Sequence, residues 1–265
     1  MGAGPLVLLG HLRARLSEQG DRVSETIVEA PGDSWRAEIR TAFELARGVA
    51  DAVRAAIARD EFPLVLSGNC GPAAMGCVAA LAAPPAVCWF DAHGDFNTPD
   101  TTSGGFLDGM ALATLTGKCS GELARGISGV PPVREESVVL IGGRDLDPPE
   151  AQALASSSMY HIAEHNLRVQ LPAALTAVSA LHRDVYVHFD ADVLDPSHGA
   201  VNSYSVPGGL LLEDVRWAIE QICRHMRPAA ASVTAFDPAS DPSNRALDAV
   251  VSSTLMLLNT CMGVA

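Results

Sequence analysis

The sequence predicts an α/β fold in which a mostly parallel central sheet is covered by helices on both faces, giving three α/β/α layers. Short apolar runs without polar alternation recur along the chain, and helical patterns lie between them. Continuous apolar strands that alternate with helices are typical of a parallel sheet buried on both faces. The chain has 265 residues, of which 48% are hydrophobic. It can therefore bury one large core, and we expect a single domain over residues 1–265.

Seven apolar runs give the expected strands in chain order. They are LVLL at 6–9, LVL at 64–66, AVCWF at 86–90, VVLI at 138–141, MYHI at 159–162, VYVHF at 185–189 and SVTAF at 232–236. Helical patterns cover 35–59, 73–83, 149–156, 172–182, 212–227 and 245–259. The active site of a parallel sheet lies beyond the carboxyl ends of its strands. We therefore expect function in the polar segments that follow these runs.

The composition favours a protein that acts on a small molecule. The formal net charge is −13, which argues against nucleic acid or an anionic membrane as a partner. The six cysteines show no short disulfide framework, as expected of reduced thiols in a cytoplasmic protein. The N-terminus lacks the features of a signal peptide, and no segment is apolar for long enough to span a bilayer.

Two clusters of acidic residues, one of them with a histidine, follow two of the apolar runs. The first is Asp91-Ala-His93-Gly-Asp95, and the second is Asp190-Ala-Asp192. Alternate residues of an extended chain point the same way, so each cluster can direct its side chains at one point. Closely packed carboxylates repel one another and must take up protons or bind cations. The clusters therefore predict a site for divalent metal.

The donor set fits two metal ions better than one. Carboxylates can bridge two ions, and an oxygen-rich set with one nitrogen suits Mn²⁺ or a similar ion. Paired ions roughly 3.5–4 Å apart can activate a shared nucleophile and polarise the bond that it attacks. The alternative is that these aspartates are helix caps and turn formers, which is common for an isolated Asp-x-Asp. Two clusters, each after an apolar strand, favour the metal site.

The segments DAHGDFN (91–97) and HFDADVLDP (188–196) resemble the two signature motifs of the arginase/agmatinase (ureohydrolase) superfamily. SGNCG after the strand at 64–66 and IGGRDLDPPE at 141–150 extend the resemblance along the chain. The resemblance implies an arginase-like fold, a dinuclear manganese centre with two Mn²⁺ per chain, and a homo-oligomer. In having a cysteine in SGNCG, the sequence also resembles one branch of the superfamily, the amidinohydrolases that cleave hydroxyarginine.

The resemblance implies a set of six metal ligands. They are Cys70, Asp91, His93, Asp95, Asp190 and Asp192, with Asp91 and Asp190 as bridges. Asp95 and Cys70 would complete the coordination of one ion, and His93 and Asp192 would complete the coordination of the other. Cys70 stands where the family usually has a histidine, and a thiolate is softer than imidazole and selects less for manganese. The alternative is that Cys70 only fills space and leaves that metal position weak.

Substrate contacts are also implied by the resemblance. They are Asn97, Ser103, Asp147, His198 and Tyr204. Asn97 and Asp147 match residues that contact the α-carboxylate and α-amino groups of amino-acid substrates. His198 and Tyr204 lie in the loop after the second motif, where the family sets substrate shape. A lone loop histidine such as His198 is alternatively just solvated.

Proton transfer is assigned to Asp192 or Asp108. Asp108 stands where most of the family has a histidine, and a carboxylate could still relay a proton or bind a cationic substrate. The alternative for Asp108 is a solvated loop residue. The family's glutamate that pairs with the guanidinium group corresponds here to Ala235, which removes a bidentate contact. Asp237 lies on the same strand face and could substitute for it.

Together these residues predict a metal-dependent hydrolase that cleaves a C–N bond in a linear guanidino or amidino compound, such as a modified arginine-like amino acid. One alternative is a formimino- or amide-type C–N hydrolase on the same metal scaffold. The other is a catalytically inactive arginase-like binding protein. Urea release would indicate the first function, ammonia or formamide release the second, and tight binding without turnover the third.

Overall fold

The computed structural model describes residues 1–30, 32, 37–129 and 131–262. Within them, six strands form one sheet in the order β1-β6-β5-β2-β3-β4, and every pair is parallel. The strands are β1 (Leu64–Leu66), β2 (Ala86–Asp91), β3 (Val138–Gly142), β4 (Tyr160–Ile162), β5 (Asp184–Asp190) and β6 (Arg227–Thr234). The predicted parallel sheet is confirmed, and six of the seven expected strands lie in it.

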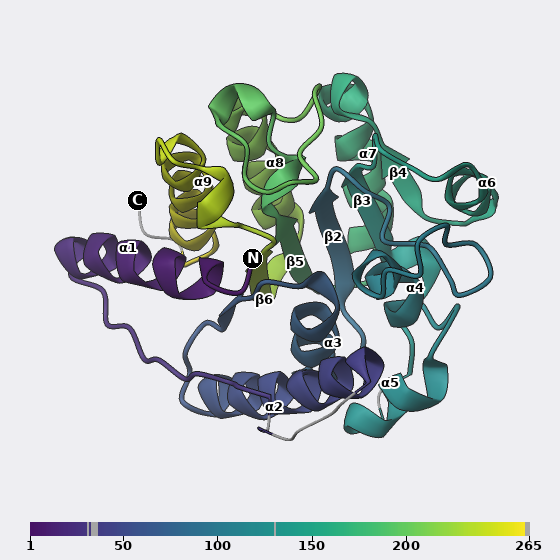
Figure 1. The fold of residues 1–265 in the computed structure, drawn as a ribbon, viewed down its shortest axis with the longest axis horizontal. Helices are drawn as coiled ribbons and strands as arrows, with labels where there is room; N and C mark the ends of the chain where they lie inside the picture. Colours follow the sequence, from purple (N-terminus) through teal and green to yellow (C-terminus); the bar gives the residue numbers. More distant parts are fainter. Residues whose placement is uncertain (31, 33–36, 130, 263–265) are drawn as a thin grey trace.

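Helices cover both faces of this sheet, which confirms the three-layer architecture (Figure 1). One layer consists of α1 (Gly4–Gln19), α7 (Leu167–Ser179), α8 (Leu212–His225) and α9 (Arg245–Met262). The other consists of α2 (Glu38–Ala58), α3 (Cys70–Ala80), α4 (Ala111–Leu115) and α6 (Pro148–Ser156), with α5 (Gly121–Ser128) packed against α2 and α3. Alternate strand residues serve the two layers: Phe90 packs in the first core and Trp89 in the second.

Short 3₁₀ segments connect these elements in the described chain. They are η1 (Asp108–Met110), η2 (Glu135–Ser137), η3 (Glu164–Asn166), η4 (Ala191–Val193), η5 (Pro196–His198) and η6 (Pro238–Ser240). Three of them begin after an aspartate whose side chain accepts a backbone hydrogen bond: Asp190, Asp195 and Asp237. No helix in the described residues has the length and apolar character needed to cross a membrane.

The expected strand at 6–9 is wrong, because these residues belong to α1. Leu8 and Leu12 are buried while Leu6 is 59% exposed, which is the four-residue spacing of an amphipathic helix. A four-residue apolar run cannot distinguish a strand from part of a helix. Other boundaries also shift: α7 starts at Leu167 rather than at Pro172, and α4 and α5 were not expected. The expected helix start at 35 lies outside the described residues.

The order of the strands places the functional segments. β2 and β5 are neighbours, although β3 and β4 lie between them in sequence and continue the sheet on the other side of β2. Phe90 is in register with Phe189, so Asp91 and Asp190 leave the sheet side by side at its carboxyl edge. Asp190 is in turn in register with Thr234 of β6. The chain reverses its direction of winding at this point, which is where open α/β sheets bind ligands.

Candidate metal centre

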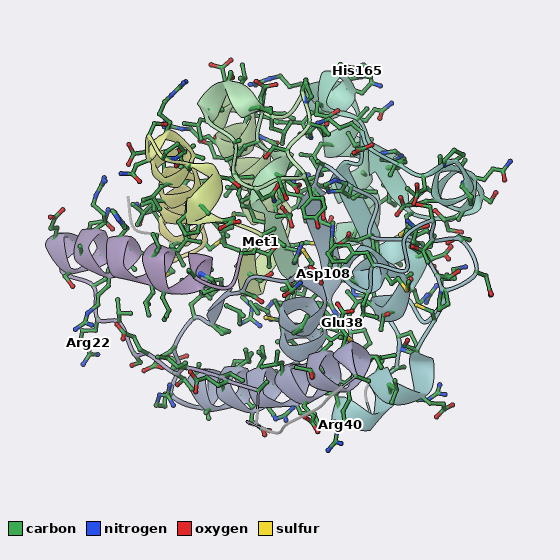
Figure 2. All side chains as sticks on the ribbon, in the orientation of Figure 1. Met1, Arg22, Glu38, Arg40, Asp108 and His165 are labelled. Atoms are coloured by element: carbon green, nitrogen blue, oxygen red, sulfur yellow. The ribbon has the colours of Figure 1, made fainter. Side chains whose placement is uncertain are left out.

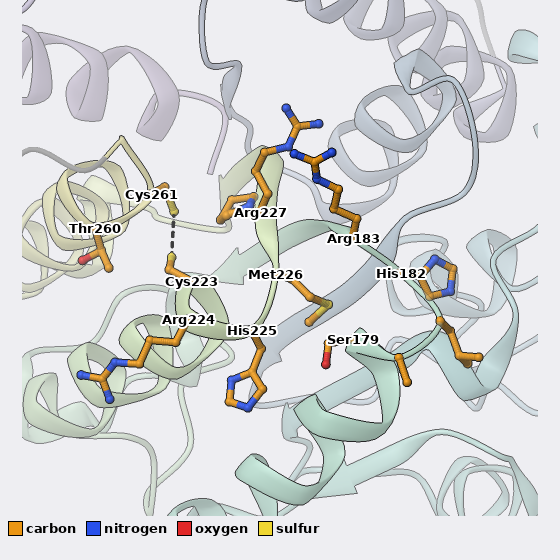
Figure 3. A pocket seen from close by; sticks show the side chains of 13 residues that line it. Ser179, His182, Arg183, Cys223, Arg224, His225, Met226, Arg227, Thr260 and Cys261 are labelled. Carbon is orange, nitrogen blue, oxygen red and sulfur yellow. Dashed lines mark hydrogen bonds between the residues drawn. The ribbon is translucent and has the colours of Figure 1, made fainter.

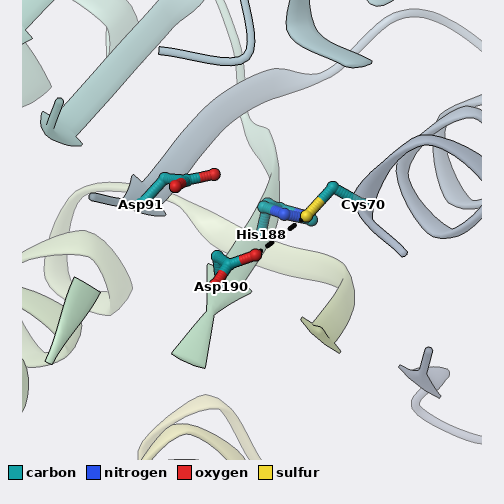
Figure 4. A group of neighbouring side chains, drawn as sticks. All are labelled: Cys70, Asp91, His188 and Asp190. Atoms are coloured by element: carbon teal, nitrogen blue, oxygen red, sulfur yellow. Dashed lines mark hydrogen bonds between the residues drawn. The ribbon is translucent and has the colours of Figure 1, made fainter. Parts of the chain in front are cut away.

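The N-terminus of α3 meets the carboxyl ends of β5 and β6 at a buried group of polar side chains. Cys70 Sγ lies 2.9 Å from Asp190 Oδ2 (Figure 4). It also lies 3.2 Å from Thr234 Oγ1. The Thr234 hydroxyl donates to the same oxygen of Asp190 at 3.2 Å. All three side chains are buried. The structure therefore places Cys70 within reach of any ion that Asp190 binds.

Asp91 ends β2 and is held from two sides. Trp89 Nε1 donates to Asp91 Oδ2 at 3.0 Å, and the backbone amide of His93 donates to Asp91 Oδ1 at 2.7 Å. The side chain is 1% exposed. Among the described residues, Oδ2 accepts only the hydrogen bond from Trp89 and keeps a lone pair. Oδ1 also meets the ring Nδ1 of His93 at 3.3 Å, a contact that an ion between the two side chains would replace. Asp91 can therefore bridge two ions.

His93 lies among three carboxylates. Its Nδ1 is 3.3 Å from Asp91 Oδ1 and 3.4 Å from Asp192 Oδ2, and its Nε2 is 3.8 Å from Asp145 Oδ2. Burial disfavours the charged imidazole, but the hydrogen bond to Asp91 and the neighbouring carboxylates outweigh it and raise the pKa of His93 to about 9. Asp145 was not expected from the sequence. It belongs to the RDLD segment, and its two-residue spacing from Asp147 was the available signal.

Asp192 is fixed by two donors at the start of the segment after β5. The Ala92 amide donates to Asp192 Oδ1 at 3.2 Å, and Asn202 Nδ2 donates to Asp192 Oδ2 at 3.2 Å. Asn202 is 3% exposed and also donates to the backbone oxygen of Ala235 at 2.9 Å. Sequence reasoning missed Asn202, because an asparagine in a Gly- and Ser-containing loop first suggests a turn. In the structure, the side-chain amide of Asn202 orients the Asp192 carboxylate.

Asp95 provides the test of whether these residues fit a metal. It has a positive φ of 47° and a side chain that is 7% exposed. Its Oδ2 is buried and has no hydrogen-bond partner. A buried carboxylate oxygen without a donor is costly unless a proton or a cation satisfies it. The donor chemistry and this unpartnered oxygen fit divalent metal.

The electrostatics of the cluster lead to the same result. Burial, together with repulsion from neighbouring carboxylates, raises the pKa of Asp91 to about 6 and the pKa values of Asp95 and Asp190 well above their usual range. Burial and the carboxylate of Asp190 also raise the pKa of the Cys70 thiol. The protein without metal therefore holds protons here that a cation would displace.

The described residues contain two groups of donor atoms close enough to hold an ion. The first consists of Cys70, Asp91, His188 and Asp190, and the second of Asp91, His93 and Asp192. Five of the six expected ligands fall in these groups. The sixth, Asp95, is outside them, but the charges of Asp91 and Asp190 raise its pKa. His188 was not expected, because it reads as part of the apolar run of β5. A polar residue with the same strand parity as Asp190 was the signal that could have revealed it.

Three of the expected substrate contacts lie together. Asn97 Nδ2 donates to Asp147 Oδ2 at 3.3 Å, and Ser103 Oγ lies 3.2 Å from both oxygens of Asp147. Thr101 Oγ1 donates to Asn97 Oδ1 at 3.0 Å and orients the amide. Asn97 and Asp147 each follow, by two residues, an acid of the metal region: Asp95 and Asp145. The group therefore borders the centre.

The remaining two expected contacts have different positions. The Tyr204 ring lies edge-on to the His93 ring with centroids 6.4 Å apart, and it stacks on Phe106 at 5.8 Å. Tyr204 and Phe106 are 47% and 44% exposed, so they form an aromatic wall beside the centre. The His198 Nε2 atom is buried without a hydrogen-bond partner. Among the described contacts, none joins His198 to the metal groups.

Asp108 caps helix α3 (Figure 2). Its Oδ2 accepts the Cys70 amide at 2.9 Å and the Asn69 side-chain amide at 3.0 Å, and its Oδ1 accepts the Gly71 amide at 2.8 Å. Burial raises the pKa of Asp108, and these hydrogen bonds oppose that shift. The contacts describe a residue that positions Cys70, whereas the sequence suggested a proton relay. Its hydrogen bonds reach the metal region only through the backbone amide of Cys70.

Ala235 follows β6 with a positive φ of 61°. Its side chain is 6% exposed, so a carboxylate at this position would point into a buried environment. Asp237 lies elsewhere: its side chain accepts the Ala239 amide at 3.1 Å and pairs with the N-terminal amine at 3.4 Å. These contacts occupy Asp237 and do not support the expectation that it substitutes for the glutamate that the resemblance implied.

A cavity of about 580 Å³ lies at the opposite ends of the strands (Figure 3). Arg183, just before β5, and Arg227, the first residue of β6, line it together with Cys223 and Cys261. The two sulfur atoms are 3.3 Å apart. None of its lining residues belongs to the metal groups, so this cavity is separate from the candidate centre.

Comparison with known proteins identifies the family of this chain. A match to the arginase family spans residues 14–258. The N(omega)-hydroxy-L-arginine amidinohydrolase of Streptomyces lavendulae is 31% identical over 218 residues, which cover 80% of this chain and 74% of that protein. The arginase of Staphylococcus aureus (strain MRSA252) is 31% identical over 209 residues, which cover 76% of this chain and 68% of that protein.

Solved structures show the same fold. The crystal structure of arginase from Bacillus subtilis subsp. subtilis str. 168 aligns with a TM-score of 0.85 at 27% identity and covers 97% of this chain and 91% of that chain. The formimidoylglutamase from the same strain aligns with a TM-score of 0.74 at 19% identity, over 97% of this chain and 81% of that chain. This chain belongs to the arginase family of hydrolases, which act on C–N bonds of amidino compounds.

Proposed function

We propose that this protein is a dinuclear-metal hydrolase that cleaves a C–N bond in a guanidino compound with an α-amino acid end, such as a modified arginine. The observation that supports the proposal is the hydrogen-bonded Asn97–Ser103–Asp147 group, two of whose members follow Asp95 and Asp145 of the metal region by two residues. A metal centre alone would serve many reactions. A carboxylate, an amide and a hydroxyl beside it suit the charged end of an amino acid.

The residues that would hold the ions divide between two positions. Cys70 and Asp95 belong to the first, and His93 and Asp192 to the second. Asp91 and Asp190 would serve both: Asp91 belongs to both donor groups, and Asp190, in the first group, has two carboxylate oxygens to offer. When bound, the two ions supply Lewis-acid polarisation and activation of water. An oxygen-rich set with one nitrogen, as in the second position, favours Mn²⁺.

Asp192 is the residue that we assign to proton transfer. Its Oδ2 is held by Asn202 at 3.2 Å and lies 3.4 Å from His93 Nδ1. Asn202 fixes the carboxylate, so that Oδ2 can accept a proton from the attacking water and return it to the leaving amine. We assign Asp108 to positioning Cys70, because backbone and Asn69 amides already occupy its oxygens.

Substrate recognition follows from the group beside the centre. The Asp147 carboxylate would bind the α-ammonium group, and the Asn97 amide and Ser103 hydroxyl would bind the α-carboxylate. The aromatic wall of Tyr204 and Phe106 would pack against the aliphatic part of the substrate. The relative named for N(omega)-hydroxy-L-arginine makes that compound the first guanidino substrate to test.

A formimino-type substrate is the second candidate, and Ala235 is the observation that favours it. Without a carboxylate at this position, a full guanidinium group loses a bidentate partner. A formimino group is smaller and has fewer N–H donors, so it depends less on a carboxylate at that position. The fold of formimidoylglutamase is compatible with such chemistry on this scaffold.

The test combines metal content with a substrate panel. Protein purified without chelator is analysed for metals, loaded with Mn²⁺, and assayed with L-arginine, N-hydroxy-L-arginine, agmatine and formiminoglutamate. We expect turnover of an amino-acid guanidine, with urea or hydroxyurea released, and much slower turnover of agmatine, which lacks the α-carboxylate. Formamide release would support the second candidate. No turnover from protein that carries two ions per chain would overturn the proposal and indicate a binding protein.

A further inference from the structure

His188 lies inside the metal region and has no part in the mechanism described above. It is fully buried on β5 two residues before Asp190, so both side chains leave the same face of the strand. One ring nitrogen of His188, the Cys70 sulfur and one oxygen each from Asp91 and Asp190 all lie within 4.8 Å of one another (Figure 4). A single ion could bind all four atoms.

A single tryptophan organises two of these four donors. The imidazole of His188 stacks on the indole of Trp89, with ring centroids 3.7 Å apart and planes inclined by 18°. The same indole donates from Nε1 to Asp91 Oδ2 at 3.0 Å. Trp89 is itself fully buried, so the ring edge of His188 is held in one direction. Preorganisation of this kind is what a metal ligand needs.

The two ring nitrogens of His188 have unequal surroundings. Its Nδ1 lies 2.9 Å from Ser232 Oγ and 3.1 Å from Tyr186 OH, two hydroxyls that can accept a hydrogen bond from its N–H. Its Nε2 meets the Thr234 hydroxyl at 3.3 Å, a long contact. The two hydroxyls beside Nδ1 can hold its N–H, which leaves Nε2 as the nitrogen with a free lone pair. Metal-bound histidines typically donate their second ring N–H to such a partner.

We infer that His188 is a metal ligand and that Cys70 and His188 together make the first metal position select Zn²⁺ over Mn²⁺. The inference rests on the proposed dinuclear centre. Helix α3 brings the Cys70 thiolate to this position, and β5 brings the His188 imidazole to the same space. In this set His188 takes the place given above to Asp95, and one sulfur, one nitrogen and two oxygens suit four-coordinate zinc. The position with His93 and Asp192 keeps an oxygen-rich set, so the native centre pairs two different ions.

Cobalt and zinc binding to the whole chain test the inference without any assay of turnover. Metal-free protein titrated with one equivalent of Co²⁺ should show a thiolate-to-cobalt charge-transfer band and the intense visible bands of four-coordinate cobalt. Competition of Zn²⁺ with Mn²⁺ should leave one zinc per chain in the presence of excess manganese. In His188→Phe, which can keep the stack on Trp89, zinc affinity should fall by more than about 100-fold. His165→Phe, at an exposed position, is the matched control.

Two further variants separate a ligand from an orienting residue. Thr234→Val removes the hydroxyl between His188 and Asp190 while keeping the shape of the side chain. If His188 is a ligand, this variant keeps the cobalt bands, whereas an indirect role through Thr234 would make it match His188→Phe. In His93→Ala protein with one zinc, X-ray absorption should still show imidazole scattering beside sulfur. Loss of that scattering would overturn the inference even if His188→Phe proved unable to fold.

The failure of this inference can be told apart from the failure of the proposed function. A cobalt spectrum that is unchanged in His188→Phe removes His188 from the ligand set but leaves hydrolysis of guanidino substrates untouched. Absence of turnover from protein with the expected zinc–sulfur signal removes the function and keeps the ligand assignment. A Cys70→Ser variant that retains the charge-transfer band would overturn the role of the thiolate.

Discussion

The carboxylate of Asp108 accepts the backbone amide of Cys70 at 2.9 Å, so one side chain fixes the first residue of α3 and, with it, the thiol that faces Asp190. Replacing Asp108 by Ala should cost about 1–3 kcal/mol of stability, because buried amides lose their acceptor. Metal affinity should fall with it, since Cys70 is no longer held. Urea denaturation and metal titration measure the two effects. Asp100→Ala, in the exposed part of the same loop, is the control.

An amide in place of the first bridging carboxylate tests the centre itself. Asp91→Asn should bind no more than one ion per chain and lose hydrolysis, because a neutral amide is a poor bridge between two cations. Elemental analysis and a urea assay on the same sample measure both. Asp145→Asn, which removes an acid that is 59% exposed and 3.8 Å from His93, should keep both ions. Full activity in Asp91→Asn would contradict the proposed mechanism.

Metal removal should make stability depend on pH. The folded-state pKa values of Asp91, Asp95 and Asp190 lie above the ordinary carboxyl value. Such groups hold their protons more tightly in the folded chain, so they stabilise it fully below the ordinary pKa of about 4, and this contribution is lost as the pH rises through the folded values. For Asp91 that value is about 6. In EDTA, the melting temperature should therefore fall between acidic and neutral pH.

The comparison with Asp95→Asn isolates this effect. In EDTA at neutral pH the variant should melt at a higher temperature than the unmodified chain, because it lacks one repelling carboxylate. Asp184, whose pKa is lowered by Arg227, acts in the opposite direction but equally in both proteins, so it cancels in the difference. With Mn²⁺ present the order should reverse. A variant that is less stable in both conditions would show that repulsion at Asp95 is not significant.

Ala235→Glu should improve the hydrolysis of substrates with a full guanidinium group. A new charge-assisted hydrogen bond is worth roughly 1.5–3 kcal/mol, which corresponds to about 10–100-fold in kcat/KM. The position has a positive φ, so Ala235→Gly serves as the control for backbone strain and should leave kcat/KM unchanged. Kinetics on L-arginine compare the three proteins. An unchanged kcat/KM in the glutamate variant would place the guanidinium group elsewhere.

Recognition of the α-amino group depends on Asp147. Asp147→Asn should raise KM about tenfold or more for an amino-acid substrate, because the amide leaves the ammonium group without a charged partner. Metal content should not change, since Asp147 contacts Asn97 and Ser103 and not the metal groups. A selective loss on amino acids, with agmatine turnover retained, would support the assignment. Equal losses on both substrates would contradict it.

The sequence predicted the interior of the sheet better than its surroundings. The runs at 86–90, 138–141 and 185–189 became β2, β3 and β5, because strands buried on both faces must be continuously apolar. The run at 6–9 became a helix, because a short apolar run carries no period. The short helices α4 and α5 follow a long polar loop, and neither is long enough for its pattern to stand out.

The candidate site could be predicted in its acids but not in its supporting residues. Asp91 and Asp190 follow apolar strands in a recognisable spacing, and the structure places them side by side. His188, Asn202 and Trp89 sit in apolar or turn-like segments, where neighbouring strands and loops alone decide what they contact. Their roles depend on register and on loop closure, which the local sequence does not encode. The expected homo-oligomer and the cytoplasmic location stay predictions.

Because β5 lies between β2 and β6, the centre of the sheet stays incomplete until late in synthesis on the ribosome. Cys70 and Asp190 are 120 residues apart in the sequence, and β5 is among the last strands to be synthesised. Until it emerges, β2 exposes an unpaired apolar edge, which is a template for aggregation. No metal can relieve this stage, because half of the acids have not yet been made. Chaperone binding to nascent chains should therefore be strongest just before β5 is translated.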